Sequence, residues 1–371
     1  MTYILGWKWQ GSAYLCADTA VTEPGDGPKP SQRSSYGERS FSDTKRTVHE
    51  GVMKLFHLGN VAVALCGDIQ NARAFIEELS ERLKSGQPSI DALGKTVANR
   101  TPIDKRAEFK LLIVVNGQED RRLFAFNMNG DQALTESQDG QLVQFGSIPG
   151  HMAGMTQQWL DALVRHFAAD SDSMLAISVS MLQSYGVHDY LMDSGVGGTF
   201  CGLVADSRGL RWQKDLLTMI YGPKFQPIGM IAAIVRDNVL IVRSNLNNRC
   251  GYFGDALMGA LDDRWKARWW DDSFEHIRTG RFHFVALISN GQRTLTVAEM
   301  RQELKSDYVH ITPPPEPRDA PTFGLRVDLS PTVQKQMRYL PDDRGDGTVP
   351  MAISWTPFLD RAARERGAPA P

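Results

Sequence analysis

The chain of 371 residues has few cysteines, no long apolar run and almost no net charge. Its four cysteines are scattered through apolar stretches and no pair has metal-ligand spacing, which predicts reduced, buried thiols in a cytoplasmic protein without a metal site. The 41 basic and 43 acidic residues nearly cancel, so the composition provides no attraction to nucleic acid or to a membrane surface. We therefore expect neither as a partner.

The apolar stretches are also too short for membrane insertion. No run approaches the roughly 20 residues that a membrane-spanning helix needs. Lys8, Gln10 and Ser12 interrupt the first apolar stretch, so we do not expect it to be a signal peptide. With 42% hydrophobic and 23% charged residues, the composition is that of a globular protein, and the length indicates about two domains.

Short apolar runs separated by turn residues predict β-hairpins near the start of the chain. Two predicted hairpins, with turns at Gln10-Gly11 and Gly59-Asn60, cover residues 2–9 and 12–18 and residues 52–58 and 60–67. Two helices follow, then further strands, a second helix pair and closing strands that end at residue 221. This order predicts antiparallel sheets with helices outside them, rather than βαβ units. The expected fold class is α+β, as a four-layer αββα sandwich.

Two segments lie outside this pattern. Residues 23–50 are polar and rich in proline and glycine, which predicts a long loop that is functional or disordered. After residue 225 the pattern of strands restarts, so we expect a first domain over 2–225 and a C-terminal extension of unknown role over 226–371. In the extension we expect a hairpin, a strand, a short helix and a partly extended tail, at 228–245, 282–290, 297–305 and 313–371.

The second residue, Thr2, predicts a specific chemistry. Once Met1 is removed, Thr2 carries a hydroxyl and a free α-amine on one residue. The unperturbed pKa of an α-amine is about 7.7–8.0, so a useful fraction is neutral at pH 7 and can accept the proton of the hydroxyl. That is the threonine form of an N-terminal nucleophile.

Several short motifs that follow Thr2 carry the other groups of such a site. The motifs ADT, VMKLFHL, LCGD, FGS and MDSGVGGTF supply Asp18, Lys54, Gly67, Ser147 and the pair Asp193 and Ser194. In type, order and spacing these residues resemble the proteasome family of N-terminal nucleophile (Ntn) hydrolases. The resemblance is to the β-type peptidase subunits and to the bacterial peptidase of ATP-dependent two-component proteases, and it spans about residues 2–221.

The resemblance implies a role for each residue. The ammonium of Lys54 would lower the pKa of the Thr2 hydroxyl and of the α-amine, and Asp18 would hold Lys54 charged and in place. The N–H of Gly67, next to a helix N-terminus, would stabilise the tetrahedral oxyanion. No cofactor or metal is implied. The supporting residues would be Ser147, Asp193 and Ser194.

The resemblance also implies a biological setting. It predicts a threonine-type peptidase acting on peptides or unfolded protein, in a homo-oligomeric ring or stack, with a possible separate ATPase or unfoldase. Two alternatives stay open: an amidohydrolase of the same fold that acts on a small amide, and an inactive assembly protein of that fold.

Two features depart from the family. The distance from Asp18 to Lys54 is longer than in the family, and the excess is the loop 23–50, with SSYGE at 34–38. In this fold the loop would border the substrate cleft, where it would line or gate the cleft or carry subunit contacts. The extension 226–371 has no counterpart that we recognise.

Overall fold

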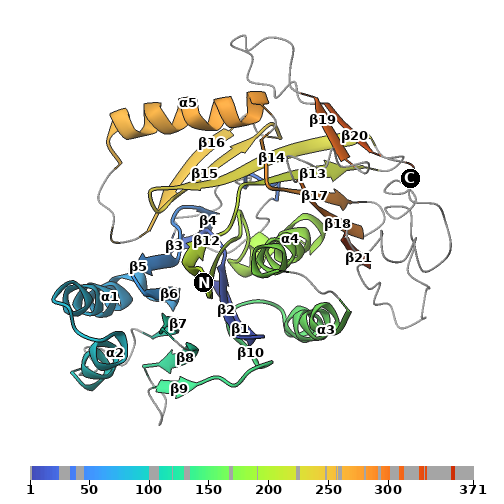
Figure 1. Ribbon diagram of the computed structural model, residues 1–371. Coiled ribbons are helices and arrows are strands. Elements are labelled where there is room, and N and C mark those ends of the chain that lie inside the picture. The colour runs from blue at the N-terminus through green and yellow to red at the C-terminus, as the bar shows by residue number, and fades with distance from the viewer. Residues whose placement is uncertain are drawn as a thin grey trace.

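Figure 1 shows the computed structural model of the chain. It describes residues 2–24, 34–38, 46–99, 108–118, 120–128, 134–166, 170–189, 191–222, 226–246, 249–255, 257, 261–279, 281–290, 294–300, 309–312, 326–329, 331 and 352–355. Most of the tail expected at 313–371 and two stretches of the loop 23–50 lie outside these ranges. No helix in the described part of the chain is long and apolar enough to span a membrane.

The first sheet contains the two strands of the first predicted hairpin, β1 and β2, side by side. Its strand order is β10-β1-β2-β11-β12, with β1 (Tyr3–Trp9), β2 (Ser12–Ala17), β10 (Leu142–Gly146), β11 (Cys201–Asp206) and β12 (Gly209–Trp212). The turn at Gln10-Gly11 is confirmed, since both residues have positive φ, 46° and 72°.

The second sheet has the order β5-β6-β7-β8-β9. Its strands are β5 (Leu55–Leu58), β6 (Val61–Gly67), β7 (Phe109–Asn116), β8 (Arg121–Asn127) and β9 (Leu134–Glu136). The predicted hairpin at Gly59-Asn60 is confirmed by the antiparallel pairing of β5 with β6. Between the two sheets in sequence, β3 (Ala20–Pro24) and β4 (Arg46–Glu50) pair as a two-stranded ribbon at the base of the long loop.

Helices cover these sheets because each presents an apolar face to one of them. The helices α1 (Ile69–Lys84) and α2 (Ser89–Ala98) share a core with the second sheet, which includes Phe75 and Phe109. The other face of that sheet packs on the first sheet, as in the contact of Leu112 with the cluster around Leu15. The helices α3 (Gly150–His166) and α4 (Ser171–Asp189) pack on the remaining face of the first sheet.

A third, seven-stranded sheet lies beyond α4. Its order is β16-β15-β14-β13-β17-β18-β21, with β13 (Leu216–Tyr221), β14 (Pro227–Arg236), β15 (Val239–Ser244), β16 (Arg249–Gly254), β17 (Phe284–Ser289), β18 (Thr294–Glu299) and β21 (Ala352–Trp355). Figure 1 shows α4 between the first sheet and this one, and α5 (Asp263–Thr279) on its far side. Because α4 contacts a sheet on both sides, its sequence is apolar or small all round rather than on one face.

The third sheet differs from the sequence expectations in two ways. The strand β13 precedes residue 225 but pairs with β14 and β17, so one sheet crosses the boundary expected at 225/226. The short helix expected at 297–305 is wrong at its start, since residues 297–299 belong to β18, which pairs with β17. The hairpin expected at 228–245 is confirmed, with Asp237 and Asn238 at positive φ in its turn.

The remaining described elements are short. They are the 3-10 helix η1 (Leu191–Ser194) and the pair β19 (Val309–Thr312) and β20 (Arg326–Leu329).

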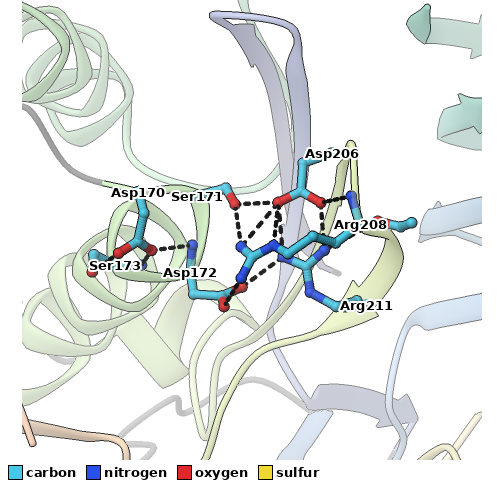
Figure 2. A network of polar contacts seen from close by, with 8 residues as sticks. Asp170, Ser171, Asp172, Ser173, Asp206, Arg208 and Arg211 are labelled. Atoms are coloured by element: carbon cyan, nitrogen blue, oxygen red, sulfur yellow. Dashed lines mark hydrogen bonds and ion pairs between the residues drawn. The ribbon is translucent and has the colours of Figure 1, made fainter. Parts of the chain in front are cut away.

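A polar network fixes the start of α4 against the end of β11 (Figure 2). The Asp206 carboxylate accepts hydrogen bonds from Ser171, Arg208 and Arg211. Asp172 pairs with the same two arginines at 3.1 and 2.7 Å. Burial alone raises the pKa of Asp206, but the hydrogen bonds outweigh it and hold that pKa well below its ordinary value.

Candidate active site

Thr2 lies at the start of β1, with its backbone fixed by the end of β10. The residue is 4% exposed. Its carbonyl oxygen accepts a hydrogen bond from the Ser147 N–H at 3.0 Å, and Tyr3 pairs with Gly146. Gly146 has a φ of +130°, and a Cβ there would lie 1.8 Å from the Thr2 oxygen. Only glycine allows this approach, so the FGS motif sets the backbone position of Thr2.

The Asp18 carboxylate binds the N–H of Tyr3, the residue after Thr2, and joins two backbone segments. Its Oδ1 accepts a hydrogen bond from the Tyr3 N–H at 3.1 Å, and its Oδ2 accepts one from the Gly197 N–H at 3.0 Å. The Asp18 N–H in turn donates to the Tyr3 carbonyl at 3.3 Å. Asp18 is fully buried, with one oxygen bound to β1 and the other to Gly197, so it is part of the interior and not a solvated turn.

Lys54 completes a buried ion pair. Its Nζ lies 2.6 Å from Asp18 Oδ1 and also donates to the carbonyl of Ala20, and both charged side chains are at most 2% exposed. The Leu65 N–H donates to the Lys54 carbonyl at 3.0 Å, which ties the lysine to β6. Burial raises the pKa of Asp18, and the Lys54 ammonium and the amide N–H donors oppose that rise.

Gly67 ends β6, two residues after the contact of Leu65 with Lys54. Its φ is +102°, and a Cβ would lie 2.3 Å from the Glu108 carbonyl oxygen, so this position requires glycine. The next residue, Asp68, caps α1 by accepting a hydrogen bond from the Asn71 N–H at 3.0 Å. A glycine N–H beside a helix N-terminus is thus formed as expected, and its service to an oxyanion stays a prediction.

Of the three predicted supporting residues, Ser147 contacts Thr2, whereas Asp193 and Ser194 lie in η1. Ser147 contacts Thr2 through its backbone N–H. Asp193 is exposed and Ser194 is half-buried in η1. From this segment, contact with Asp18 comes through the amide of Gly197, three residues further on. The structure thus joins Ser147 to the Thr2 backbone and Lys54 to Asp18, which binds the residue after Thr2, while the catalytic and supporting roles of all these residues stay predictions.

Sequence reasoning did not single out two buried carboxylates of the long loop. Glu38 Oε2 accepts a hydrogen bond from the Gly198 N–H at 2.6 Å, and Glu50 Oε1 accepts one from the Thr199 hydroxyl at 2.9 Å. Both glutamates therefore contact residues 198–199, which directly follow Gly197, the residue whose N–H binds Asp18. The only sequence signal was the motif SSYGE, in which the serines and the glycine indicate a turn and not a buried acid.

The site contains the buried ammonium of Lys54, the carboxylate of Asp18 and the hydroxyl-bearing residue Thr2. Side chains of these types can take part in acid–base chemistry without a cofactor. Within the described ranges, no group of His, Cys, Asp and Glu side chains is arranged to hold a metal ion. The ammonium of Lys54 is held by a carboxylate that also binds the residue after Thr2. A positive charge in such a place favours a neutral amine and an ionised hydroxyl.

Comparison with known proteins yields likenesses in structure alone. No protein-family model matches the chain, and no curated protein matches it. Eukaryotic HslV from Trypanosoma brucei is similar in structure, with a TM-score of 0.38 and 12% sequence identity. The likeness covers 55% of this chain and 99% of that one.

Proposed function

We propose that this protein is a threonine-type peptidase of the Ntn-hydrolase class, which hydrolyses peptide amide bonds through Thr2. The paired sheets flanked by helices would then be the αββα sandwich of that class, with the third sheet as an addition. The proposal requires that Thr2 become the first residue, so that its α-amine is free.

The observation that carries the proposal is the double role of the Asp18 carboxylate. One oxygen, Oδ1, accepts from both the Lys54 ammonium at 2.6 Å and the Tyr3 N–H at 3.1 Å. If Lys54 served only packing, nothing would require its carboxylate partner to bind the N–H of Tyr3 as well, the residue directly after Thr2. A shared oxygen instead fixes the cation relative to Thr2, which suits a group that acts on the Thr2 hydroxyl.

The chemistry follows from these positions. The α-amine of Thr2 takes the proton of its own hydroxyl, and the oxygen attacks the carbonyl carbon of the scissile peptide bond. The Gly67 N–H would donate to the oxyanion of the tetrahedral intermediate. The protonated amine then gives its proton to the leaving nitrogen as the C–N bond breaks, which leaves an ester on Thr2. Water, deprotonated by the same amine, attacks the ester carbonyl; the amine returns that proton to the Thr2 oxygen as the ester C–O bond breaks, which releases the acid and restores the hydroxyl.

The wider setting is also a proposal. We expect peptides or unfolded protein as substrates, a homo-oligomer that shields the sites, and a separate ATPase if folded proteins are to be degraded. An amidohydrolase for small amides would use the same residues, so a panel of peptides and small amides distinguishes the two. An inactive assembly protein would show neither activity.

The experiment that tests the nucleophile combines mass and labelling. Intact mass of the purified protein should show loss of Met1, and a β-lactone or epoxyketone reagent should label Thr2. Thr2→Ala should abolish labelling and lower kcat by about a thousandfold or more. Thr135→Ala, at an exposed threonine of β9, is the matched control and should leave both unchanged. Retained Met1, or labelling that persists in Thr2→Ala, contradicts the proposal.

A further inference from the structure

The described centre of the long loop is buried against the third sheet. Residues 34–38 include Ser34, Ser35 and Glu38, all at most 4% exposed. The hydroxyl of Tyr36 lies 3.3 Å from that of Thr218 on β13. The Ser244 hydroxyl on β15 donates to the Ser35 carbonyl. A polar segment with such contacts is part of the interior and not a solvated loop.

Glu38 lies in a notch that glycines form. The Gly198 N–H donates to its Oε2 at 2.6 Å. A Cβ on Gly197 would lie 2.8 Å from Oε2, and a Cβ on Gly186 of α4 would lie 1.8 Å from Oε1. Among the described residues, Oε1 has no hydrogen-bond partner. The glycines are therefore needed to admit this side chain, which indicates that the notch and Glu38 fit each other.

Glu50 holds the other end of the same turn. Its Oε1 accepts from the Thr199 hydroxyl at 2.9 Å, and its Oε2 accepts from the N–H and the hydroxyl of Ser35. The Thr199 N–H donates to the hydroxyl of Thr19 at 3.0 Å. Gly195–Gly198, which we call the glycine turn, is thus held by Glu38 directly and by Glu50 through Thr199.

The glycine turn is what binds Asp18 from the side opposite β1. The Gly197 N–H donates to Asp18 Oδ2, and the next N–H in the chain, that of Gly198, donates to Glu38. Two consecutive N–H groups therefore bind two different carboxylates. A shift of the turn toward or away from Glu38 moves the donor to Asp18, and Asp18 holds Lys54.

We propose that Glu38 is a positioning residue for the Thr2 site, which acts by holding the glycine turn that fixes the carboxylate of Asp18. This inference rests on the proposed function for its consequence in catalysis. The contacts of the turn with Glu38 and Asp18 do not depend on it.

The protonation state of Glu38 provides a signature of this role. Burial, with the negative charges of Glu50 and Asp18 nearby, raises the pKa of Glu38 to about 8, against the hydrogen bonds from the Gly198 N–H and the Ser34 side chain. In the described part of the chain, the titratable groups that interact with Glu38 are these two carboxylates and the Tyr36 hydroxyl, while α4 presents the backbone of Gly186. With a pKa raised in this way, Glu38 would be mostly neutral at pH 7, and its ionisation as the pH rises through about 8 would place a further negative charge beside the turn.

The test compares Glu38→Gln, which mimics the neutral acid, with Glu38→Ala, which empties the notch. Wild-type kcat/KM should fall as the pH rises above about 8, and Glu38→Gln should keep its rate at pH 7 while losing this alkaline limb. Glu38→Ala should lower kcat by up to about a hundredfold, because small misplacements of catalytic groups have effects of that size. Glu23→Gln, at an exposed glutamate of the same loop, is the matched control and should change neither.

Hydrogen exchange measures the turn without reference to hydrolysis. The peptide that covers Gly195–Phe200 should exchange faster in Glu38→Ala than in wild type and at the wild-type rate in Glu38→Gln. An unchanged alkaline limb in Glu38→Gln, or unchanged exchange in a folded Glu38→Ala, overturns the positioning role. A wild-type protein that is neither labelled nor active rejects the proposed function alone, and the exchange result then decides the contact of Glu38 with the turn.

Discussion

Replacing Lys54 by methionine tests the central pair of the site through stability. The Lys54 and Asp18 side chains are 2% and 0% exposed, so methionine fills the space of the lysine stem but leaves a buried carboxylate without a cation. Removing one partner of a buried ion pair costs about 3–5 kcal/mol, because the remaining charge is uncompensated. Two amide N–H groups still bind Asp18, so we expect a loss in unfolding free energy toward the lower end, about 3 kcal/mol.

The loss in unfolding free energy should depend on pH, and the burial of Asp18 sets the direction of that dependence. Burial raises the pKa of Asp18, and without Lys54 the ammonium that opposes this rise is gone. Between the unfolded pKa of about 3.9 and the higher folded pKa, the native variant binds more protons than its unfolded chain. Its unfolding free energy therefore falls as the pH rises through that window, and the variant is closest to wild type near pH 4.

Urea unfolding at several pH values between 4 and 8 measures both effects. Lys84→Met, at a lysine whose side chain is 70% exposed on α1, is the control and should change the unfolding free energy by less than about 0.5 kcal/mol. The double variant Asp18→Asn/Lys54→Met removes both charges and should recover part of the loss and lose the pH dependence. A Lys54→Met protein that is as stable as wild type at pH 7 would refute the reasoning, because the charge left behind would then not be buried.

Two further predictions concern the backbone at Thr2 and the network at α4. Gly146→Ala should abolish activity by displacing Thr2, because its Cβ would lie 1.8 Å from the Thr2 carbonyl oxygen. The control Gly11→Ala is also at positive φ but has no atom within 4 Å of its Cβ. It should lower the unfolding free energy, measured in urea, by only about 1–2 kcal/mol. Asp206→Asn should cost about 2 kcal/mol at pH 7 through its lost hydrogen bonds to arginine. Because the folded pKa of Asp206 is lowered, wild type loses this advantage as the pH falls below about 4, and urea unfolding at pH 3 and 7 should show the difference shrink.

Local turn chemistry explains why the hairpins could be predicted from sequence. The turns at Gln10-Gly11 and Asp237-Asn238 have positive φ, which Gly11, Asp237 and Asn238 tolerate as residue types. The pairing of strands on either side then follows from the turn itself. The Asp18–Lys54 contact is of another kind, since its residues lie far apart in sequence. This contact could be predicted only from the resemblance to the proteasome family, in which an aspartate and a lysine occur in the same order.

The start of the segment at 297–305 shows where local preference loses to tertiary packing, while residues 301–305 lie outside the described ranges. Ala298, Glu299 and Met300 favour a helix in isolation. Residues 294–299 instead form β18, an interior strand between β17 and β21 with Leu295 and Val297 fully buried. A strand that completes a buried sheet is stabilised by neighbours that the local sequence does not reveal.

The long loop could not be predicted for the same reason, and its burial connects the site to the third sheet. Its polar residues suggest solvent, yet Ser35 and Glu50 are buried because each satisfies the other's hydrogen bonds. The same segment contacts β13 and β15 through the hydroxyls of Tyr36 and Ser244. If Glu38 positions the glycine turn, the third sheet is the support against which that positioning occurs. The strands after residue 225 then contribute to the geometry of Asp18, which is a reason for one sheet to include both them and β13.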